Sequence, residues 1–181
     1  MLIYTVGHSN HPIEKFLGLL TGNGITAVAD VRSQPYSRRF TQFNKERLAA
    51  TLNQHGIAYV FLGQELGARS NDDSCYEDGQ VRYARLAATP LFKQGIDRVV
   101  TGAGKFRVAL MCAEKEPLDC HRTLLVSRAL EQRGGSIAHI LADGSVEPHA
   151  HAMTRLTRIT RQEDIDTACR LREQKIAYKR Q

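Results

Sequence analysis

The chain has 181 residues, of which 42% are apolar, and a formal net charge of +6. This length is enough for one hydrophobic core and short for two, so we expect one main domain followed by a tail. No apolar run approaches the roughly 20 residues that cross a bilayer, and the N-terminal segment lacks the basic and then apolar layout of a signal peptide, so we predict a cytoplasmic protein with no membrane partner.

Short apolar runs alternate along the chain with longer segments that have apolar residues at helical spacing. The short, β-branched runs predict five strands, and the segments between them predict four helices. The predicted strands are residues 2–6, 25–31, 57–62, 106–111 and 136–141. The predicted helices are residues 13–20, 44–55, 81–101 with an interruption near Pro90, and 123–132 with Asp119 as N-cap. Residues 63–80 are polar and rich in turn formers, which predicts a loop.

Strands separated by helix-length connections are typical of parallel βα units. We therefore predict an α/β fold over residues 1–146, with a mostly parallel five-stranded sheet flanked by helices. Residues 147–181 are predicted to be a helical tail, one basic amphipathic helix that begins at a capping box from Thr160 to Glu163. From His149 onward the tail has eight Lys or Arg against four Asp or Glu, so much of the net positive charge lies there.

Reactive side chains follow the predicted strands, at the edge where open parallel sheets bind their ligands. They are His8 and Ser9 after the first strand, Asp30 and Arg32 at the end of the second, Cys112 and Glu114 after the fourth, and Cys120, His121 and Arg122 at the next helix. Each has a structural explanation by itself: Ser9 can cap a helix, Asp30 can pair with an arginine, and cysteines are often buried as small hydrophobic residues. Their convergence on one edge favours a functional site.

The loop of residues 112–122 carries most of the candidate chemistry, because it joins a strand to a helix whose first turn has unpaired N–H groups. Such a turn binds anions and stabilises thiolates. We predict that Cys120 or Cys112 is a nucleophile and that Glu114 or His121 moves a proton. In the same scheme Asp30 orients a base or a substrate hydroxyl, Arg32 and Arg122 hold an anion, and His8 and Ser9 complete the pocket.

Two further features have open interpretations. Residues 33–39, which include Ser37, form a basic, hydroxyl-bearing loop that either contacts a substrate phosphate or is a solvated connection shaped by Pro35. Cys112, Cys120 and His121, with Asp30 or Glu114, also offer metal ligands. Adjacent Cys and His ligands are geometrically awkward and the chain has no C-x-x-C pair, so the sequence alone assigns no metal ligand and no cofactor.

At these positions the chain resembles a bacterial family, the domain of unknown function 488. The resemblance rests on Thr5-Val-Gly-His-Ser9, on Asp30-Val-Arg-Ser-Gln-Pro-Tyr-Ser37 and on the loop from Cys112 to Arg122. It extends over roughly residues 1–144 and implies an α/β fold and a shared importance of these positions. It implies no activity, and the tail lies outside it.

Three functions remain open from the sequence. The first is an enzyme, a hydrolase or transferase that acts on an anionic small molecule such as a nucleotide or phosphate ester. The second is a nucleic-acid-associated protein that grips phosphates through the basic tail, although no recognised binding motif supports it. The third is a metal or redox module built on the two cysteines. The sequence does not indicate the oligomeric state.

Overall fold

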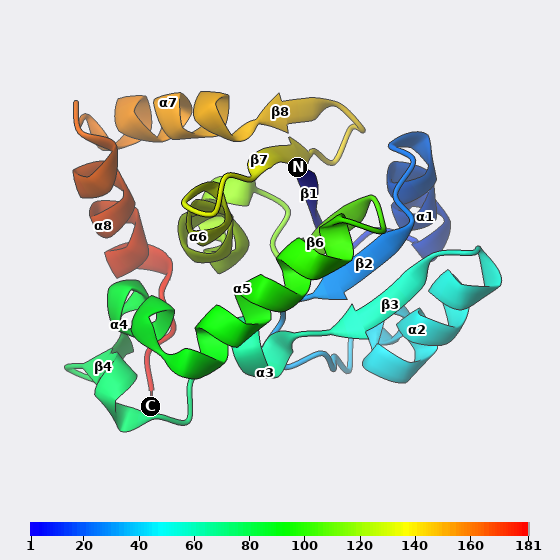
Figure 1. The fold of residues 1–181 in the computed structure, drawn as a ribbon, viewed down its shortest axis with the longest axis horizontal. Coiled ribbons are helices and arrows are strands. Elements are labelled where there is room, and N and C mark those ends of the chain that lie inside the picture. Colours follow the sequence, from blue (N-terminus) through cyan, green and yellow to red (C-terminus); the bar gives the residue numbers. More distant parts are fainter. Residues whose placement is uncertain (181) are drawn as a thin grey trace.

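The computed structural model describes residues 1–180, and a six-stranded sheet forms its centre (Figure 1). In spatial order the strands are β3 (Ala58–Phe61), β2 (Ala27–Asp30), β6 (Val108–Cys112), β1 (Leu2–Gly7), β7 (Ser136–Ile140) and β8 (Val146–Pro148). The first five run parallel, and β8 runs antiparallel to β7. The predicted α/β class and mostly parallel sheet are confirmed, with one strand more than expected. β8 has only three residues and ends in a proline, which an edge strand tolerates, so it gives little sequence signal.

The sheet is covered on both faces, so its central strands are buried except for Leu2 at the start of β1. Side chains alternate between the two sides: Ile3 and Leu110 belong to one apolar cluster, and Tyr4 and Met111 belong to the other. Strands of this kind appear in a sequence as continuous apolar runs, which is why β1, β2 and β6 were predictable.

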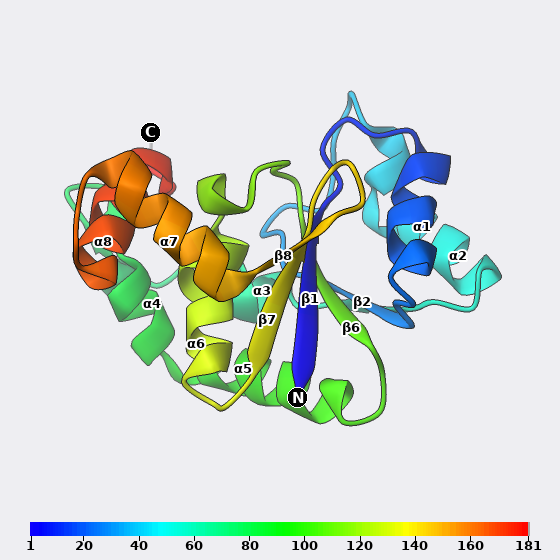
Figure 2. The ribbon, with the colours of Figure 1, turned by 90° about the horizontal axis from the view of Figure 1, so that it is seen from above.

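Helices form two layers around the sheet, with α1 and α2 on one side and the other long helices opposite (Figure 2). The helices are α1 (Ile13–Gly22), α2 (Lys45–Gln54), α3 (Gly63–Leu66), α4 (Tyr83–Ala88), α5 (Pro90–Ala103), α6 (Arg128–Glu131), α7 (His149–Thr160) and α8 (Ile165–Ile176). The chain also has three short 3-10 turns and one π-helical segment. The turns are η1 (Thr41–Phe43), η2 (Asp73–Cys75) and η3 (Pro117–Asp119), and the π-helical segment is η4 (Arg122–Ser127). Among residues 1–180, no helix is long and apolar enough to span a membrane.

The interruption predicted near Pro90 is confirmed, because α4 ends at Ala88 and α5 begins at Pro90. Thr89 caps α5 by accepting a hydrogen bond from the Phe92 N–H group, and proline suits the first position of a helix. Residues 63–80, expected to be a loop, contain α3, η2 and a small antiparallel hairpin of β4 (Tyr76–Glu77) and β5 (Gln80–Val81). These elements are too short for a periodic pattern.

The tail forms two helices rather than the single helix expected. α7 ends where Arg161 takes a left-handed conformation, with φ of 55°, and α8 begins after Asp164, whose carboxylate accepts a hydrogen bond from the Thr167 N–H group at 2.7 Å. The N-cap is therefore Asp164, and the expected capping box from Thr160 to Glu163 is wrong.

The tail packs against the rest of the chain. Buried side chains of α7 and α8, among them Met153 and Cys169, belong to the same apolar cluster as Ile3. Beyond α8, the Val81 N–H group donates a hydrogen bond to the Tyr178 carbonyl at 3.0 Å. The proposed boundary between residues 146 and 147 falls inside β8, and it stays a prediction.

Candidate functional site

The carboxyl ends of three parallel strands bring the sequence motifs together. In the register of the sheet, Gly7 at the end of β1 pairs with Cys112 at the end of β6, and Asp30 at the end of β2 pairs with Met111. The motifs that begin at Thr5, Asp30 and Cys112 therefore meet at one edge, as the predicted topology requires.

Gly7 allows the loop that follows β6 to pass close over the end of β1. A Cβ atom at this position would lie 1.9 Å from the Glu114 carbonyl oxygen. The His8 and Ser9 N–H groups donate hydrogen bonds to the carbonyls of Cys112 and Ala113, each at 2.9 Å. A side chain at residue 7 would displace the loop that holds the candidate catalytic residues.

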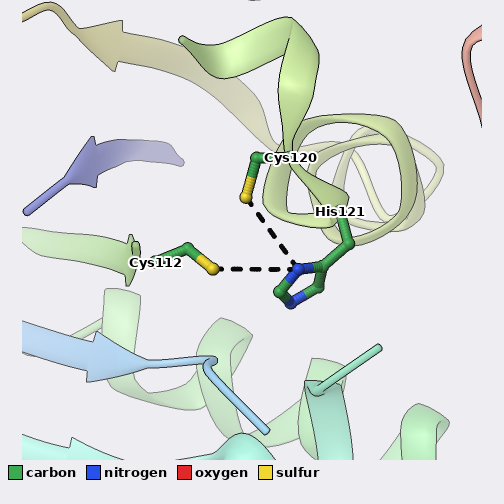
Figure 3. Close-up of side chains that lie close together, drawn as sticks. All are labelled: Cys112, Cys120 and His121. Carbon is green, nitrogen blue, oxygen red and sulfur yellow. Dashed lines mark hydrogen bonds between the residues drawn. The ribbon is translucent and has the colours of Figure 1, made fainter. Parts of the chain in front are cut away.

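Two thiols and an imidazole converge inside this loop (Figure 3). Nδ1 of His121 lies 3.8 Å from Sγ of Cys112 and 3.9 Å from Sγ of Cys120. The other ring nitrogen, Nε2, lies 3.0 Å from the Val31 carbonyl oxygen. A carbonyl only accepts hydrogen bonds, so Nε2 carries a proton and Nδ1 faces the sulfur atoms.

The backbone changes conformation between the two neighbouring residues of this group. Cys120 is extended, with φ of −135° and ψ of 140°, and His121 is helical, with φ of −61° and ψ of −26°. This change turns adjacent side chains toward one point. The predicted N-cap at Asp119 is wrong, because Asp119 ends the turn η3 and the helix begins with η4 at Arg122, in a wide turn of a type frequent at functional sites.

The two thiols and the Glu114 carboxyl group shift one another's pKa values. The hydrogen bond with Cys120, together with burial, raises the pKa of the Cys112 thiol well above its ordinary value. Burial opposes ionisation of Cys120, but the hydrogen bond with Cys112 and the charge of Arg122 outweigh it and hold the pKa of Cys120 well below its ordinary value. Burial and the nearby Cys120 raise the pKa of Glu114, whose Oε2 lies 2.9 Å from Cys120 Sγ.

Asp30 and Arg32 form a buried ion pair beneath this group. Arg32 donates hydrogen bonds from Nε and Nη2 to the two Asp30 oxygens at 2.9 and 2.6 Å, and from Nη2 to the Phe43 carbonyl at 2.8 Å. Its Nη1 lies 3.1 Å from Nε2 of His8, and burial, followed by the charge of Arg32, lowers the pKa of that imidazole to about 4. Little of the Arg32 guanidinium is left for a ligand.

Arg122 is completely buried and starts a chain of hydrogen bonds that leads to the tail. Its Nε donates to Thr5 Oγ1 at 3.3 Å, and Thr5 Oγ1 lies 2.8 Å from Nδ1 of His139. Nε2 of His139 in turn lies 2.9 Å from Nδ1 of His149 on α7. In the proton arrangement that fits these contacts, Thr5 donates to His139 and His139 donates to His149, whose Nε2 then has no hydrogen-bond acceptor among the described residues. Nη1 of Arg122 donates to the Glu114 carbonyl at 2.7 Å, and Nη2 has no partner among the described residues.

A cavity of about 240 Å³ opens beside the loop. Four of the predicted site residues line it, namely Arg32, Cys112, Glu114 and His121. Asp30, Cys120 and Arg122 lie behind its wall, each no more than 1% exposed. His8, Ser9 and Ser37 do not line it, and the Ser37 hydroxyl instead accepts hydrogen bonds from the Arg39 and Phe40 N–H groups.

Sequence reasoning missed several residues of this cavity, among them Arg69, Tyr83 and Tyr178. Arg69 lies in the segment expected to be a featureless loop, and Tyr178 lies in the tail. The first segment begins after β3, but Arg69 lies well beyond the end of that strand, and Tyr178 lies after α8, so inspection of the residues directly after each strand could not find them. A neighbouring cavity of about 790 Å³ shares Ser33, Gln34, Arg69 and Tyr178 with the first.

Comparison with known proteins agrees with the motifs. The model of the family described as domain of unknown function DUF488 matches residues 12–129. The chain belongs to this family. The matched range contains Asp30, Arg32 and the whole 112–122 loop, whereas Thr5, His8 and His139 lie outside it. Searches of curated proteins and of solved structures found no match.

Proposed function

We propose that this DUF488 protein is an enzyme, a hydrolase or a transferase, that acts on a small anionic substrate such as a nucleotide or a phosphate ester. One observation carries the proposal: a thiol, a carboxyl and an imidazole line the same cavity as an unpaired guanidinium. These groups belong to Cys112, Glu114, His121 and Arg69. Perturbed titratable groups gathered in a cavity are typical of catalytic sites.

Arg69 is the residue that we propose holds the anion. Its side chain is exposed, its guanidinium carbon lies 4.5 Å from the centre of the Tyr178 ring, and it forms no ion pair within residues 1–180. Stacking on an aromatic ring orients a guanidinium and leaves its N–H groups free. Arg32 and Arg122 donate to protein groups, which favours a structural role for both, and their assignment to the anion stays a prediction.

The two cavities suit a substrate with a reacting end and a longer remainder. The smaller one, at about 240 Å³, is below the range of about 300–1,000 Å³ typical of ligand sites and fits only a small group. The larger one continues past Arg69 and Tyr178. We propose that the anionic group sits at Arg69, where the cavities meet, with the reacting bond toward Cys112.

Glu114 is the group that we propose moves a proton. Burial raises its pKa, which brings a carboxyl group nearer to the range useful for acid–base catalysis at neutral pH. The covalent mechanism, with Cys120 or Cys112 as nucleophile, stays a prediction. Cys112 reaches the cavity, whereas Cys120 is 1% exposed.

A nucleic-acid role has less support, because some arginines of the tail form ion pairs within the molecule. Arg155 pairs with Glu116 and Glu147, and Arg172 pairs with Asp119. Each of these ion pairs neutralises a positive charge that would otherwise attract the phosphate backbone of a nucleic acid.

Binding of inorganic phosphate and of nucleoside monophosphates, measured by titration calorimetry, tests the proposal. We expect Arg69→Ala to weaken binding at least about 10-fold, the equivalent of about 1.4 kcal/mol. Arg38→Ala is the matched control, because Arg38 is exposed and lines neither cavity. We expect Glu114→Gln to bind these anions and to lose turnover of the corresponding esters. Equal affinity of the wild type and Arg69→Ala, or no binding by the wild type, would refute the proposal.

A further inference from the structure

We propose that Cys112, Cys120 and His121 bind a divalent zinc-type metal ion, with a fourth coordination position open toward the cavity beside Glu114. Their ligand atoms, two sulfurs and one ring nitrogen, all lie within 4.8 Å of one another (Figure 3). This inference deepens the proposed function and rests on it for the substrate, because the metal ion would lie at the wall of the substrate cavity. It replaces the covalent mechanism, because sulfur atoms bound to an ion are not free to attack a substrate.

The spacing of the three atoms fits a tetrahedral zinc site. With zinc–sulfur bonds of about 2.3 Å and zinc–nitrogen bonds of about 2.0 Å, the edge between sulfur and nitrogen is about 3.5 Å. The corresponding distances from His121 Nδ1 are 3.8 Å to Cys112 and 3.9 Å to Cys120. The edge between the two sulfur atoms of such a site is about 3.8 Å, and here these atoms lie within 4.8 Å of each other. Shifts of up to about 1 Å would therefore bring all three atoms to bonding distance.

The second ring nitrogen of His121 is held as a metal-binding histidine requires. Nε2 donates its proton to the Val31 carbonyl at 3.0 Å, so the lone pair of Nδ1 faces both sulfur atoms. Ligating histidines almost always donate their other N–H group to a carbonyl or carboxylate, which fixes the ring and the tautomer. This contact comes from β2 and its following loop, so it is independent of the loop that supplies the ligands.

The surroundings of the sulfur atoms also suit thiolate ligands. The backbone N–H group of Arg122 donates a hydrogen bond to Cys120 Sγ at 3.4 Å. All three residues are buried, with exposures of 3% for Cys112, 1% for Cys120 and 8% for His121, so the ligand atoms themselves are shielded from bulk solvent. The change from extended to helical backbone between Cys120 and His121 removes the geometric objection to adjacent ligands.

Three protein ligands with an open fourth position are the pattern of a catalytic zinc site rather than a structural one. Glu114 lines the cavity beside the ligands. The ion would acidify a water molecule at the open position and so supply hydroxide for attack on the electrophilic atom of the substrate. Glu114 would take the proton of that water and give it to the leaving group as the bond between the leaving group and the substrate breaks.

Metal uptake by the full chain tests this inference. Reduced, metal-depleted protein is titrated with Zn²⁺ against a chromogenic chelator and, separately, with Co²⁺ followed by absorption. We expect one ion per chain and a cobalt spectrum with tetrahedral ligand-field bands and thiolate charge-transfer absorption. Cys112→Ala, Cys120→Ala and His121→Gln should each weaken Zn²⁺ binding by more than the roughly 10- to 100-fold that loss of an outer-shell partner costs. Cys75→Ala and Cys169→Ala are matched controls, because both cysteines are buried and lie outside the group, and they should bind as the wild type does.

Several results would overturn the metal site. They are less than one ion per wild-type chain, a cobalt spectrum without thiolate absorption, or ligand variants that bind as tightly as the two controls. Formation of a disulfide between Cys112 and Cys120 in a chain that takes up no metal would also overturn the metal site. The titration of the wild-type chain tests the metal site without any variant. A ligand variant that fails to fold therefore leaves the wild-type result valid. The failures are distinguishable: phosphate binding by metal-depleted wild type that depends on Arg69 would leave the proposed function standing without the metal.

Discussion

Nε2 of His139 lies 2.9 Å from Nδ1 of His149. This contact joins the buried strand β7 to the tail helix α7. Burial, followed by the charge of a neighbouring group, lowers the pKa of both imidazoles, to about 3 for His139 and about 4 for His149. The groups that supply this charge are His149 for His139 and Arg128 for His149. In the unfolded chain both take up protons near the ordinary value of 6.5. The unfolded state therefore binds more protons below that pH, and the folded state loses stability as the pH falls from about 6.5 toward about 4.

We predict that His149→Gln makes the free energy of unfolding less dependent on pH in this window. Each histidine that titrates only in the unfolded state contributes a slope of about 1.4 kcal/mol per pH unit. Urea unfolding of the wild type and of His149→Gln, at several pH values between about 6.5 and 4.5, measures the difference. His151→Gln is the matched control on the same helix, because His151 is exposed. Equal slopes for the wild type and His149→Gln would show that His149 does not stay neutral in the folded chain.

The ion pair of Arg32 with Asp30 gives a second prediction, on stability. Removal of the Arg32 guanidinium leaves the completely buried Asp30 carboxylate without its partner, which typically costs about 3–5 kcal/mol. We expect Arg32→Ala to lower the free energy of unfolding by about this amount. Arg69→Ala should change it by less than about 0.5 kcal/mol, because Arg69 is exposed and unpaired. Denaturant unfolding compares the two, and similar losses would remove the distinction between the arginines.

Gly7 gives a third prediction, on the close approach of two segments. In Gly7→Ala the new Cβ atom would lie 1.9 Å from the Glu114 carbonyl oxygen, so the 112–122 loop must move. We expect a loss of stability of about 1–3 kcal/mol and weaker Zn²⁺ binding. Gly18→Ala is the control: its Cβ atom would meet nothing within 4 Å inside α1, so it should gain up to about 1 kcal/mol. Unchanged stability and metal affinity in Gly7→Ala would show that the loop is not held by this contact.

Part of the site was predictable because parallel strands end at a common edge. The continuous apolar runs of β1, β2 and β6 located the edge, and the residues after them include Cys112, Glu114 and His121. The sequence allowed a pair between Asp30 and an arginine, but it could not show that Arg32 also contacts His8 and the Phe43 carbonyl, because those contacts depend on how distant segments fold together. Nor could it place Arg69 and Tyr178 at the cavity, because both come from segments outside the strand pattern.

The sequence also could not show how the tail packs against the rest of the chain, and the last prediction concerns this packing. From the sequence, a basic helix after the fifth strand is expected to be dispensable, so that a chain ending at residue 152 would fold. In the structure, Leu156 of α7 is 0% exposed and belongs to the main apolar cluster. The Tyr83 N–H group donates to Glu173 of α8 at 2.8 Å, and Tyr178 lines the cavity. We therefore predict that deletion of residues 153–181 destabilises the whole fold.

A point variant tests this without a truncation. Leu156→Ala should cost about 2–5 kcal/mol, the range for removing a buried leucine side chain from a core, and it should lower the stability of the whole chain in one transition. Ile159→Ala on the same helix is the matched control, because Ile159 is 55% exposed, and surface substitutions usually change stability by less than about 0.5 kcal/mol. Urea unfolding followed by circular dichroism and by tyrosine fluorescence measures both. If Leu156→Ala instead produced a separate early transition with the remaining structure unchanged, the tail would be an independent unit and the boundary after residue 146 would hold.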